Sequence, residues 1–416
     1  MNKDFETLTV LDYSKGVNVM ATVIEKGSKT SYEIKIERHR RKVKTIRITT
    51  AVAVTLFVIF FVIWYFNRDF NSYKVMNSVL RKDSNTVQYM PYQKDLLKYS
   101  RDGVSAIDTD GNLLWNGTYE MKNPKASICE GYVAVADIGG NDIYTVNEKG
   151  DQNKLQMLLP ITQVEVSKQG VVAALLTDND VSYINLYDST KPKQDPLVEQ
   201  EFHVENSGYP LDIALSNDGT KLVTSYLNIK NGVVKTDLAF YNFSEVGKNL
   251  VDNLVGGIPY EKTIVPEVEF LDNNTICAYG DNKFAVYTMK EKPDLVFTDT
   301  FKTEIKSIFS NDSYVGFIVN NYDGDQKYRA IVYDLKGKKI LNKPINFEYD
   351  DVMISGKEII FHSDLQAIIM SLKGKIRFNY TFKQPVSYLY PINNFNKYIL
   401  INNKEIQKIK LVEAKK

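Results

Sequence analysis

A strand-like opening segment recurs eight times in this chain, and its spacing limits the fold more than any other feature. Each opener is a proline or polar residue followed by alternating apolar and polar residues, and the openers begin at residues 85, 124, 160, 210, 266, 303, 350 and 385. The intervals run from 35 to 56 residues. One four-stranded blade of a β-propeller takes roughly 40–50 residues, so this spacing indicates one blade per opener.

The rest of each repeat also reads as β-structure. Short alternating runs are separated by Gly, Asn and Asp, which is typical of an all-β protein. Five openers begin with proline, which suits the first residue of a strand or an edge that faces a channel. The turns DTDGN, NEKGD and DLKGK predict tight hairpins. We expect an all-β β-propeller over residues 85–416, with eight blades favoured over seven; a long sandwich does not explain eight similar units.

The last unit supplies only three strands before the sequence ends, in PVSYLY, KYILINN and EIQKIKLV. An unpaired outer edge invites aggregation, so another strand is needed there. SYKVMNSVL at 72–80, inside the linker 67–84, is the ring-closing strand that we expect. Two long inserts, 187–201 and 242–262, are predicted to be polar loops at blade edges, the second with a short helical turn.

An uncharged, mostly apolar run of 19 residues, 48–66, has the length of a transmembrane α-helix. Six basic residues come just before it: Arg38, Arg40, Arg41, Lys42, Lys44 and Arg47. Net charge is +5 for residues 1–66 and −4 for the remainder. The positive-inside rule then predicts a single-pass protein of the cell membrane, with residues 1–47 as a cytoplasmic tail and the propeller extracytoplasmic.

Two other interpretations of the apolar run fit less well. A cleaved signal peptide starts near the N-terminus and ends at a small-residue site, but about 47 residues precede this run and none of that pattern follows. A buried core helix does not explain the basic cluster. We therefore expect an uncleaved signal anchor, with Trp64 and Tyr65 in an interfacial aromatic belt. The tail segment 1–37 is more apolar than a typical linker, so a small hairpin, a docking segment and a plain tether stay open.

Charge and cysteine content limit which partners and which disulfides we expect. The slightly acidic exterior lacks the basic surface that nucleic acid requires, so we predict no nucleic-acid partner. The basic cluster is expected to contact anionic lipid of the bilayer. Cys129 and Cys277 are too few for a disulfide framework and fall in different units, so they should lie on opposite sides of the ring as unbridged, buried thiols.

Two segments, LLKYSRDGVSAIDTDGNLLWNGTYEMKNP at 96–124 and GYPLDIALSNDGTKLVTSY at 208–226, resemble an uncharacterised family known only as a domain of unknown function. The resemblance implies a single-pass, membrane-anchored β-propeller protein, largely of Gram-positive bacteria. The same segments are similar to WD40-like and quinoprotein-like blade strands. The resemblance brings no catalytic residues with it.

Residues that carry chemistry are sparse. His39, His203 and His362 are far apart and have no neighbouring Cys or paired His, so no metal site, cofactor or catalytic group is predicted. NNYDGDQKY at 320–328 is rich in oxygen ligands but lacks the Gly and Glu of an EF-hand, so a hairpin turn is favoured and calcium binding stays open. A quinoprotein enzyme needs a stacking Trp, and Trp115 lies in an ordinary outer-strand context.

Three functions remain. A non-enzymatic binding or scaffolding role with a protein partner at the cell surface leads, because nothing catalytic converges in the sequence. A single-pass sensor that signals through the 1–37 tail is second, and a quinone- or metal-dependent enzyme is third. Any contact surface is expected at turns leading into the inner strands, where Tyr119, Asn123, Tyr209 and Tyr349 should lie near one mouth of the channel, unless these residues pack against neighbouring blades.

Overall fold

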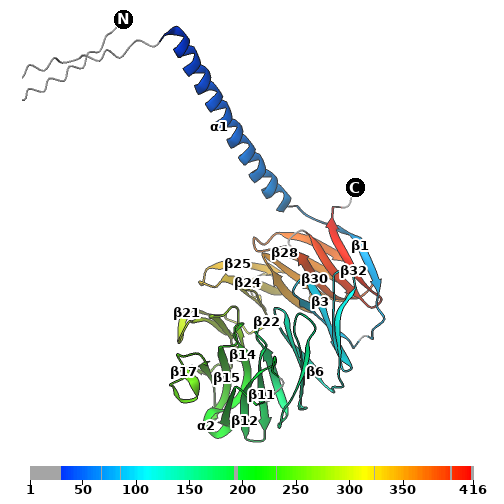
Figure 1. Ribbon diagram of the computed structural model, residues 1–416, viewed down its shortest axis with the longest axis vertical. Helices are drawn as coiled ribbons and strands as arrows, with labels where there is room; N and C mark the ends of the chain where they lie inside the picture. Colours follow the sequence, from blue (N-terminus) through cyan, green and yellow to red (C-terminus); the bar gives the residue numbers. More distant parts are fainter. Residues whose placement is uncertain are drawn as a thin grey trace, which may run out of the picture. The chain divides into compact units, whose positions relative to one another are not determined.

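The computed structural model describes residues 30–413 except 67, 85, 192–194, 231, 323 and 394–395, and it describes the backbone only for residues 62–66, 206, 230 and 393. The chain divides into two units, one up to Arg68 and one from Asp69 onward. The first contains a long helix and the second contains every described strand (Figure 1).

The helix of the first unit, α1, covers Ser31–Phe66. Glu33 accepts a hydrogen bond from the backbone N–H of Thr30 at 2.9 Å, as in a capping box. The hydroxyl groups of Thr49, Thr50 and Thr55 donate to carbonyls one turn earlier, which satisfies the polar groups of the apolar run. By length and composition, this is the one helix in the described residues that could cross a membrane.

The start of α1 corrects one expectation. A small hairpin was one of the alternatives for the tail segment 1–37, and residues 31–37 are helical instead. Once a capped first turn has formed, each further residue adds a hydrogen bond, so the helix continues through the basic stretch. The ion pair of Glu37 with Arg41, 3.6 Å apart, supports the same turns. Residues 1–29 and the side chains of Trp64 and Tyr65 lie outside the described part, so the predicted fold of the tail and the aromatic belt are not addressed.

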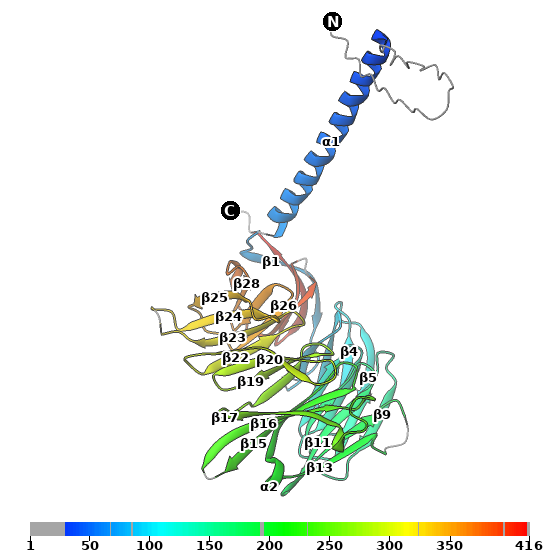
Figure 2. The same cartoon turned by 90° about the vertical axis from the view of Figure 1, so that its left-hand side faces the viewer.

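The second unit is a β-propeller of eight four-stranded antiparallel blades in its described residues, as predicted (Figures 1 and 2). From the innermost to the outermost strand, blades 1–4 are β2(Gln88–Tyr92), β3(Asp95–Ser100), β4(Gly103–Ile107), β5(Leu113–Thr118); β6(Pro124–Cys129), β7(Tyr132–Asp137), β8(Asp142–Val146), β9(Gln152–Gln156); β10(Ile161–Val166), β11(Val171–Asp178), β12(Val181–Asp188), β13(Val198–His203); and β14(Tyr209–Leu215), β15(Lys221–Lys230), β16(Val233–Asn242), β17(Leu254–Glu261).

Blades 5–8 follow the same order. They are β18(Glu267–Phe270), β19(Thr275–Tyr279), β20(Lys283–Met289), β21(Pro293–Thr300); β22(Ile305–Ser310), β23(Tyr314–Asn320), β24(Tyr328–Asp334), β25(Lys339–Ile345); β26(Asp351–Ser355), β27(Glu358–His362), β28(Gln366–Ser371), β29(Ile376–Thr381); and β30(Val386–Asn393), β31(Lys397–Asn402), β32(Glu405–Val412), β1(Ser72–Leu80). The short helices α2(Val204–Ser207) and η1(Val251–Asn253) precede β14 and β17.

The ring closes as the sequence predicts. β1 pairs antiparallel with β32, from Ser72 opposite Val412 to Leu80 opposite Glu405, so the fourth strand of the last blade comes from the start of the unit. Figure 1 shows β1 beside β32 although more than 300 residues separate them in the sequence.

The core lies between the blades. Eight buried hydrophobic clusters each join two consecutive blades, and one of them joins the last blade to the first. The middle strands of a blade therefore have a neighbour on both faces. This explains apolar runs such as Val133–Ala136, in which every side chain is fully buried.

The hairpin turns use the chemistry that their sequences predict. In DLKGK, Asp334 accepts backbone hydrogen bonds from Lys336 and Lys338, and Gly337 has a φ of +88°. The segment 320–328 joins β23 to β24 as a hairpin, although residue 323 is outside the described part.

The prediction that the two inserts are loops is wrong in part. The insert at 187–201 ends in β13, and the insert at 242–262 contains all of β17, so both hold the outermost strand of a blade rather than loop alone. An outermost strand has a free edge in solvent, so it does not need strict alternation. The predicted helical turn in the second insert is present, as η1.

The topology gives the propeller two different faces. The connections between blades and the turns between second and third strands share one face, here called the connection face. The turns between first and second and between third and fourth strands share the other, here called the turn face. Because β1 runs from Ser72 to the connection into β2, the polypeptide enters the propeller at the turn face.

Candidate functional site

A large cavity lies along the central channel of the propeller. It has a volume of about 670 Å³ and is lined by the innermost strands of blades 2–5, β6, β10, β14 and β18. Four carboxyl groups face it, those of Glu165, Asp212, Glu267 and Glu269, and the only cation among the lining residues is Lys125.

Asp212 connects three blades. One of its oxygens accepts a hydrogen bond from the Gln163 side chain of blade 3 at 2.5 Å, and the other accepts one from the backbone N–H of Val268 in blade 5 at 2.7 Å. Gln163 is itself fixed by the backbone N–H and C=O of Ile213, both at 3.0 Å. Burial raises the pKa of Asp212 to about 6 against the opposing effect of these hydrogen bonds.

Glu165 makes the equivalent contact between blades 2 and 3. It accepts a hydrogen bond from the Ser127 hydroxyl at 2.9 Å, and that hydroxyl also accepts one from the backbone N–H of Val166 at 3.2 Å. Burial, with the negative charge of Asp212, raises the pKa of Glu165 to about 7. The carboxyl group is therefore protonated in part at neutral pH.

The two glutamates of β18 differ. Glu269 accepts hydrogen bonds from the Tyr279 and Ser310 hydroxyl groups at 2.8 and 2.6 Å, which joins blade 5 to blade 6. Burial in the cavity wall and the charges of Asp212 and Glu269 raise the pKa of Glu267 to about 7. The Glu267 side chain is nevertheless exposed to the channel, so solvent screens it more than it screens Glu165.

This arrangement makes an acidic wall suited to attracting cationic groups and to binding protons. Among residues 30–413 as described, no group of three or more His, Cys, Asp or Glu is placed to hold a metal ion. This wall was not predicted from the sequence. Its signal was the charged or polar residue within the openers PKASI, PITQVEV, PLDIAL and PEVEFL, which an alignment of the blades would have brought together.

A smaller cavity of about 360 Å³ lies across the ring, between the innermost strands β26, β30 and β2. His362 lines it and pairs with Asp351 at 3.3 Å, and this hydrogen bond lowers the pKa of Asp351. His362 is thus a strand residue whose Nε2 pairs with a carboxylate, while its Nδ1 is buried without a hydrogen-bond partner among the described residues.

The four predicted contact residues all lie at connections between blades, on the connection face. Tyr119 packs on Tyr144 with ring centroids 5.3 Å apart, and Tyr349 packs on Phe361 and hydrogen-bonds Ser307 at 2.8 Å. Asn123 and Tyr209 are exposed. Two of the four therefore pack between blades, and binding by any of them stays a prediction.

Other apolar side chains are exposed on the same face. Leu158 is 96% exposed in the connection from blade 2 to blade 3, and Ile264 is exposed in the connection from blade 4 to blade 5. Ile229 and Val233 are exposed at the turn joining β15 to β16 in blade 4, which also lies on the connection face. These two strands have ten residues each, and no other described strand is as long. Tyr209 was predicted from the sequence as a contact residue, whereas Leu158, Ile229, Val233 and Ile264 were not.

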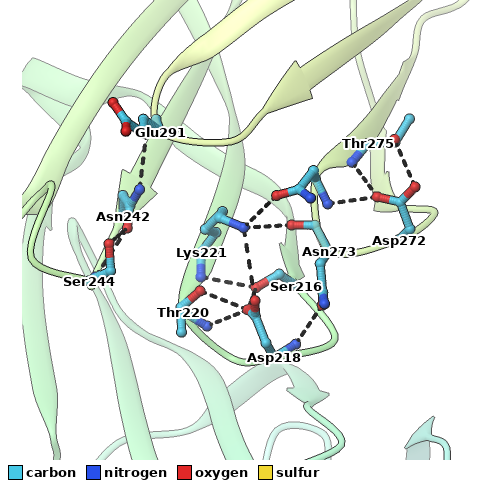
Figure 3. A network of polar contacts seen from close by, with 11 residues as sticks. Ser216, Asp218, Thr220, Lys221, Asn242, Ser244, Asp272, Asn273, Thr275 and Glu291 are labelled. Atoms are coloured by element: carbon cyan, nitrogen blue, oxygen red, sulfur yellow. Dashed lines mark hydrogen bonds and ion pairs between the residues drawn. The ribbon is translucent and has the colours of Figure 1, made fainter.

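On the turn face, blades 4 and 5 are joined by a buried lysine. Figure 3 shows the Lys221 ammonium group between Asn273 and Asp218. The ammonium group donates to the Asn273 backbone carbonyl at 2.7 Å and to the Asn274 side chain at 2.9 Å, and Asp218 is 3.9 Å away. Lys221 is 6% exposed, so these contacts replace its hydration. The network is a structural clamp between the two blades.

Trp115 and the two cysteines all lie on strands of the blades. Trp115 lies on the outermost strand of blade 1 and packs edge-on against Tyr92, with ring centroids 5.7 Å apart. Cys129 in blade 2 is half-buried, Cys277 in blade 5 is fully buried, and both thiols are free, as predicted. Two blades separate them, so they are well apart rather than strictly opposite.

The chain is similar to several solved structures, of which the first agrees with the propeller fold. BamB from Moraxella catarrhalis is 11% identical with a TM-score of 0.52, over 83% of this chain and 99% of that chain. The Pan2 WD40 domain of Neurospora crassa is 8% identical, with a TM-score of 0.44 over 84% and 97%. Hydrazine synthase from Kuenenia stuttgartiensis is 10% identical, with a TM-score of 0.45 over 70% and 95%. At these identities the likeness concerns the fold alone.

No curated protein matches the sequence. The resemblance noted from the blade segments is confirmed by a family model, described as a family of unknown function (DUF5711), which matches residues 66–411 and so covers almost the whole propeller. The chain therefore belongs to the DUF5711 family.

Proposed function

We propose that this protein is a membrane-anchored, extracytoplasmic scaffold that binds a protein partner through its connection face and performs no catalysis. The observation that carries this proposal is the exposure of five apolar side chains on that face, in blades 3–5 and the connections into them: Leu158, Tyr209, Ile229, Val233 and Ile264. The turn face also exposes apolar side chains, among them Leu197 and Val251, so the crosslinking experiment below compares the two faces. Grouped exposed apolar side chains mark interaction surfaces more often than they mark ordinary protein surface. The polypeptide enters the propeller at the turn face, so the connection face carries no link to the helix.

Two further observations support parts of the proposal. Helix α1 has the length of an anchor, and the basic cluster before its apolar part favours an exterior propeller. Trp115, the candidate stacking residue for a quinone, is packed between blades 1 and 2, which favours a binding role over a quinoprotein enzyme.

Site-specific crosslinking in living cells tests the proposal. A photoreactive residue is placed at Leu158, Ile229 or Val233 on the connection face, and at Lys149 or Lys336, exposed on the turn face, as the matched control. We expect one protein to be captured from the connection-face positions and not from the controls. Equal capture from both faces, or none from the connection face, overturns the proposal.

Deleting the N-terminal tail distinguishes a sensor from a scaffold. Residues 1–29 precede α1 and can be removed with the helix left whole. If the protein is a scaffold, this deletion leaves the crosslinked partner and the cellular phenotype unchanged. Loss of the phenotype with retained crosslinking identifies a sensor.

A further inference from the structure

The polypeptide is fixed to the turn face of blade 7 where it enters the propeller. The backbone N–H of Phe70 donates to the Arg377 carbonyl at 2.6 Å, and the Asp69 carboxylate pairs with the Lys375 ammonium group at 2.7 Å. Only residues 67–68 separate this attachment from the end of α1, and an extended chain covers at most about 3.5 Å per residue. In a protein anchored by α1, this part of the turn face is therefore held close to the bilayer surface.

Three lysines lie side by side in the neighbouring blade 8, at the ends of its strands on the turn face. Lys397 on β31 is opposite Lys410 on β32, and Lys410 is opposite Lys74 on β1. Directly opposite residues point to the same face of a sheet, so these three side chains form what is here called the lysine row. Among the described residues, none of the three forms an ion pair with a carboxylate. Like charges directly opposite one another destabilise a sheet, so an anionic partner would stabilise this row.

Protection of a free strand edge does not explain the lysine row. A lysine on an outermost strand discourages pairing with another chain, which accounts for Lys74 on β1. Lys397 and Lys410 lie on the second and third strands of the blade, where both edges are already paired. Edge protection therefore accounts for one of the three lysines.

The turn face is basic in blades 7 and 8 but not in blades 1–4. Lys357 and Lys373, in the two turns of blade 7, are exposed, and neither forms an ion pair among the described residues. The Glu358 carboxylate next to Lys357 is already paired with Arg377. The turns of blades 1–4 on the same face hold more carboxylates than cations, with Asp110, Glu148 and Asp151 among them. The unpaired positive charge is therefore concentrated where the polypeptide is attached.

We propose that the lysine row, with Lys357 and Lys373, docks the turn face of blades 7 and 8 on anionic lipid headgroups of the membrane that α1 crosses. A bilayer that contains anionic lipid has a negative surface potential, which attracts basic side chains within about one Debye length, about 8 Å at physiological ionic strength. The attachment of residues 69–70 keeps these lysines near that surface. The inference rests on α1 being an anchor, as in the proposed function, but it does not depend on a partner of the connection face.

The reactivity of individual lysines in the full-length protein tests this inference. The protein is reconstituted in nanodiscs of phosphatidylcholine, alone or with about 30% phosphatidylglycerol, acetylated with sulfo-N-hydroxysuccinimide acetate and analysed by peptide mass spectrometry. We expect acetylation of the lysine row to be at least about threefold slower in the anionic discs and to recover at about 0.5 M salt, where screening is stronger. Lys302 and Lys383, exposed on the connection face, should react equally in both kinds of disc.

A variant separates docking through the lysine row from simple proximity to the bilayer. Lys74→Gln, Lys397→Gln, Lys410→Gln removes directly opposed like charges, so it should not destabilise the sheet. In this variant the protection of Lys357 and Lys373 by anionic lipid should fall to less than half. The matched variant Lys302→Gln, Lys383→Gln, Lys404→Gln removes three exposed charges from the connection face and should leave that protection unchanged.

The possible failures are distinguishable. Equal acetylation of the lysine row in both kinds of disc overturns the inference and leaves the anchor standing. Protection by soluble polyphosphate added to phosphatidylcholine discs, with none by phosphatidylglycerol, also overturns it, because the row would then bind a soluble polyanion. Failure of the protein to enter the discs would instead contradict the anchor, on which both this inference and the proposed function rest.

Discussion

A buried charge shows how single residues hold consecutive blades together. Lys221 donates hydrogen bonds to two residues of the next blade and is almost fully buried. Replacing it with Met keeps much of the volume but leaves the Asn273 carbonyl without its donor. We expect Lys221→Met to lower the free energy of unfolding by about 1–3 kcal/mol, measured by chemical denaturation.

A surface lysine provides the control for this prediction. Lys248 forms an exposed ion pair with Glu245, so Lys248→Met should change the free energy of unfolding by less than about 0.5 kcal/mol. If both variants lose the same stability, Lys221 is not a clamp between blades.

At the scale of the strand, pairing of β1 with β32 closes the ring. Ser78 lies opposite Gln407 in this pairing. A Ser78→Cys, Gln407→Cys variant should therefore form a disulfide, because directly paired residues have Cα atoms within bridging distance. Cross-linking the two ends of the propeller should stabilise it by up to about 4–5 kcal/mol in the chain-entropy picture.

The register supplies a control for that disulfide. Lys410 lies opposite Lys74, four positions away from Ser78 along β1. The pair Ser78→Cys, Lys410→Cys should stay reduced in mass spectra of the native protein. A disulfide in this pair, or none in the matched pair, would show that the register is different.

The same strands show how far the sequence could predict the fold. The openers were identified because they alternate and five of them begin with proline, and β1 was identified because the last unit lacked a fourth strand. β13 and β17 were read as loops, since VEQEFH and LVGGIPYE form outer edges where alternation is not needed. β17 is irregular in register and β13 is not. Five of the other outermost strands, β5, β21, β25, β29 and β1, are irregular in register, which protects free edges.

The channel wall could not be predicted for a different reason. Glu165, Asp212 and Glu267 are about 50 residues apart in sequence, and each one alone resembles an ordinary polar strand residue. Only the closed ring, which places equivalent positions of successive blades around one axis, brings them to the same cavity. The fold could therefore be predicted from local sequence patterns, whereas the channel wall depends on residues that only the closed ring brings together.

At the scale of the whole molecule, basic residues are more frequent before the apolar run of α1 than after it, a difference here called the charge step. Six basic residues precede the apolar run and the ten residues after it hold two, so we expect the N-terminus inside the cell and residues 67–416 outside. Protease added to intact cells stripped of any wall should then remove the propeller epitope and leave an N-terminal tag protected. Reversing the step, with Arg38, Arg40, Arg41 and Arg47 changed to Ser and basic residues added after Phe66, should protect the propeller instead. Digestion of the N-terminal tag with a protected propeller in the unaltered protein would show the opposite orientation, and it would place the connection face and its partner in the cytoplasm.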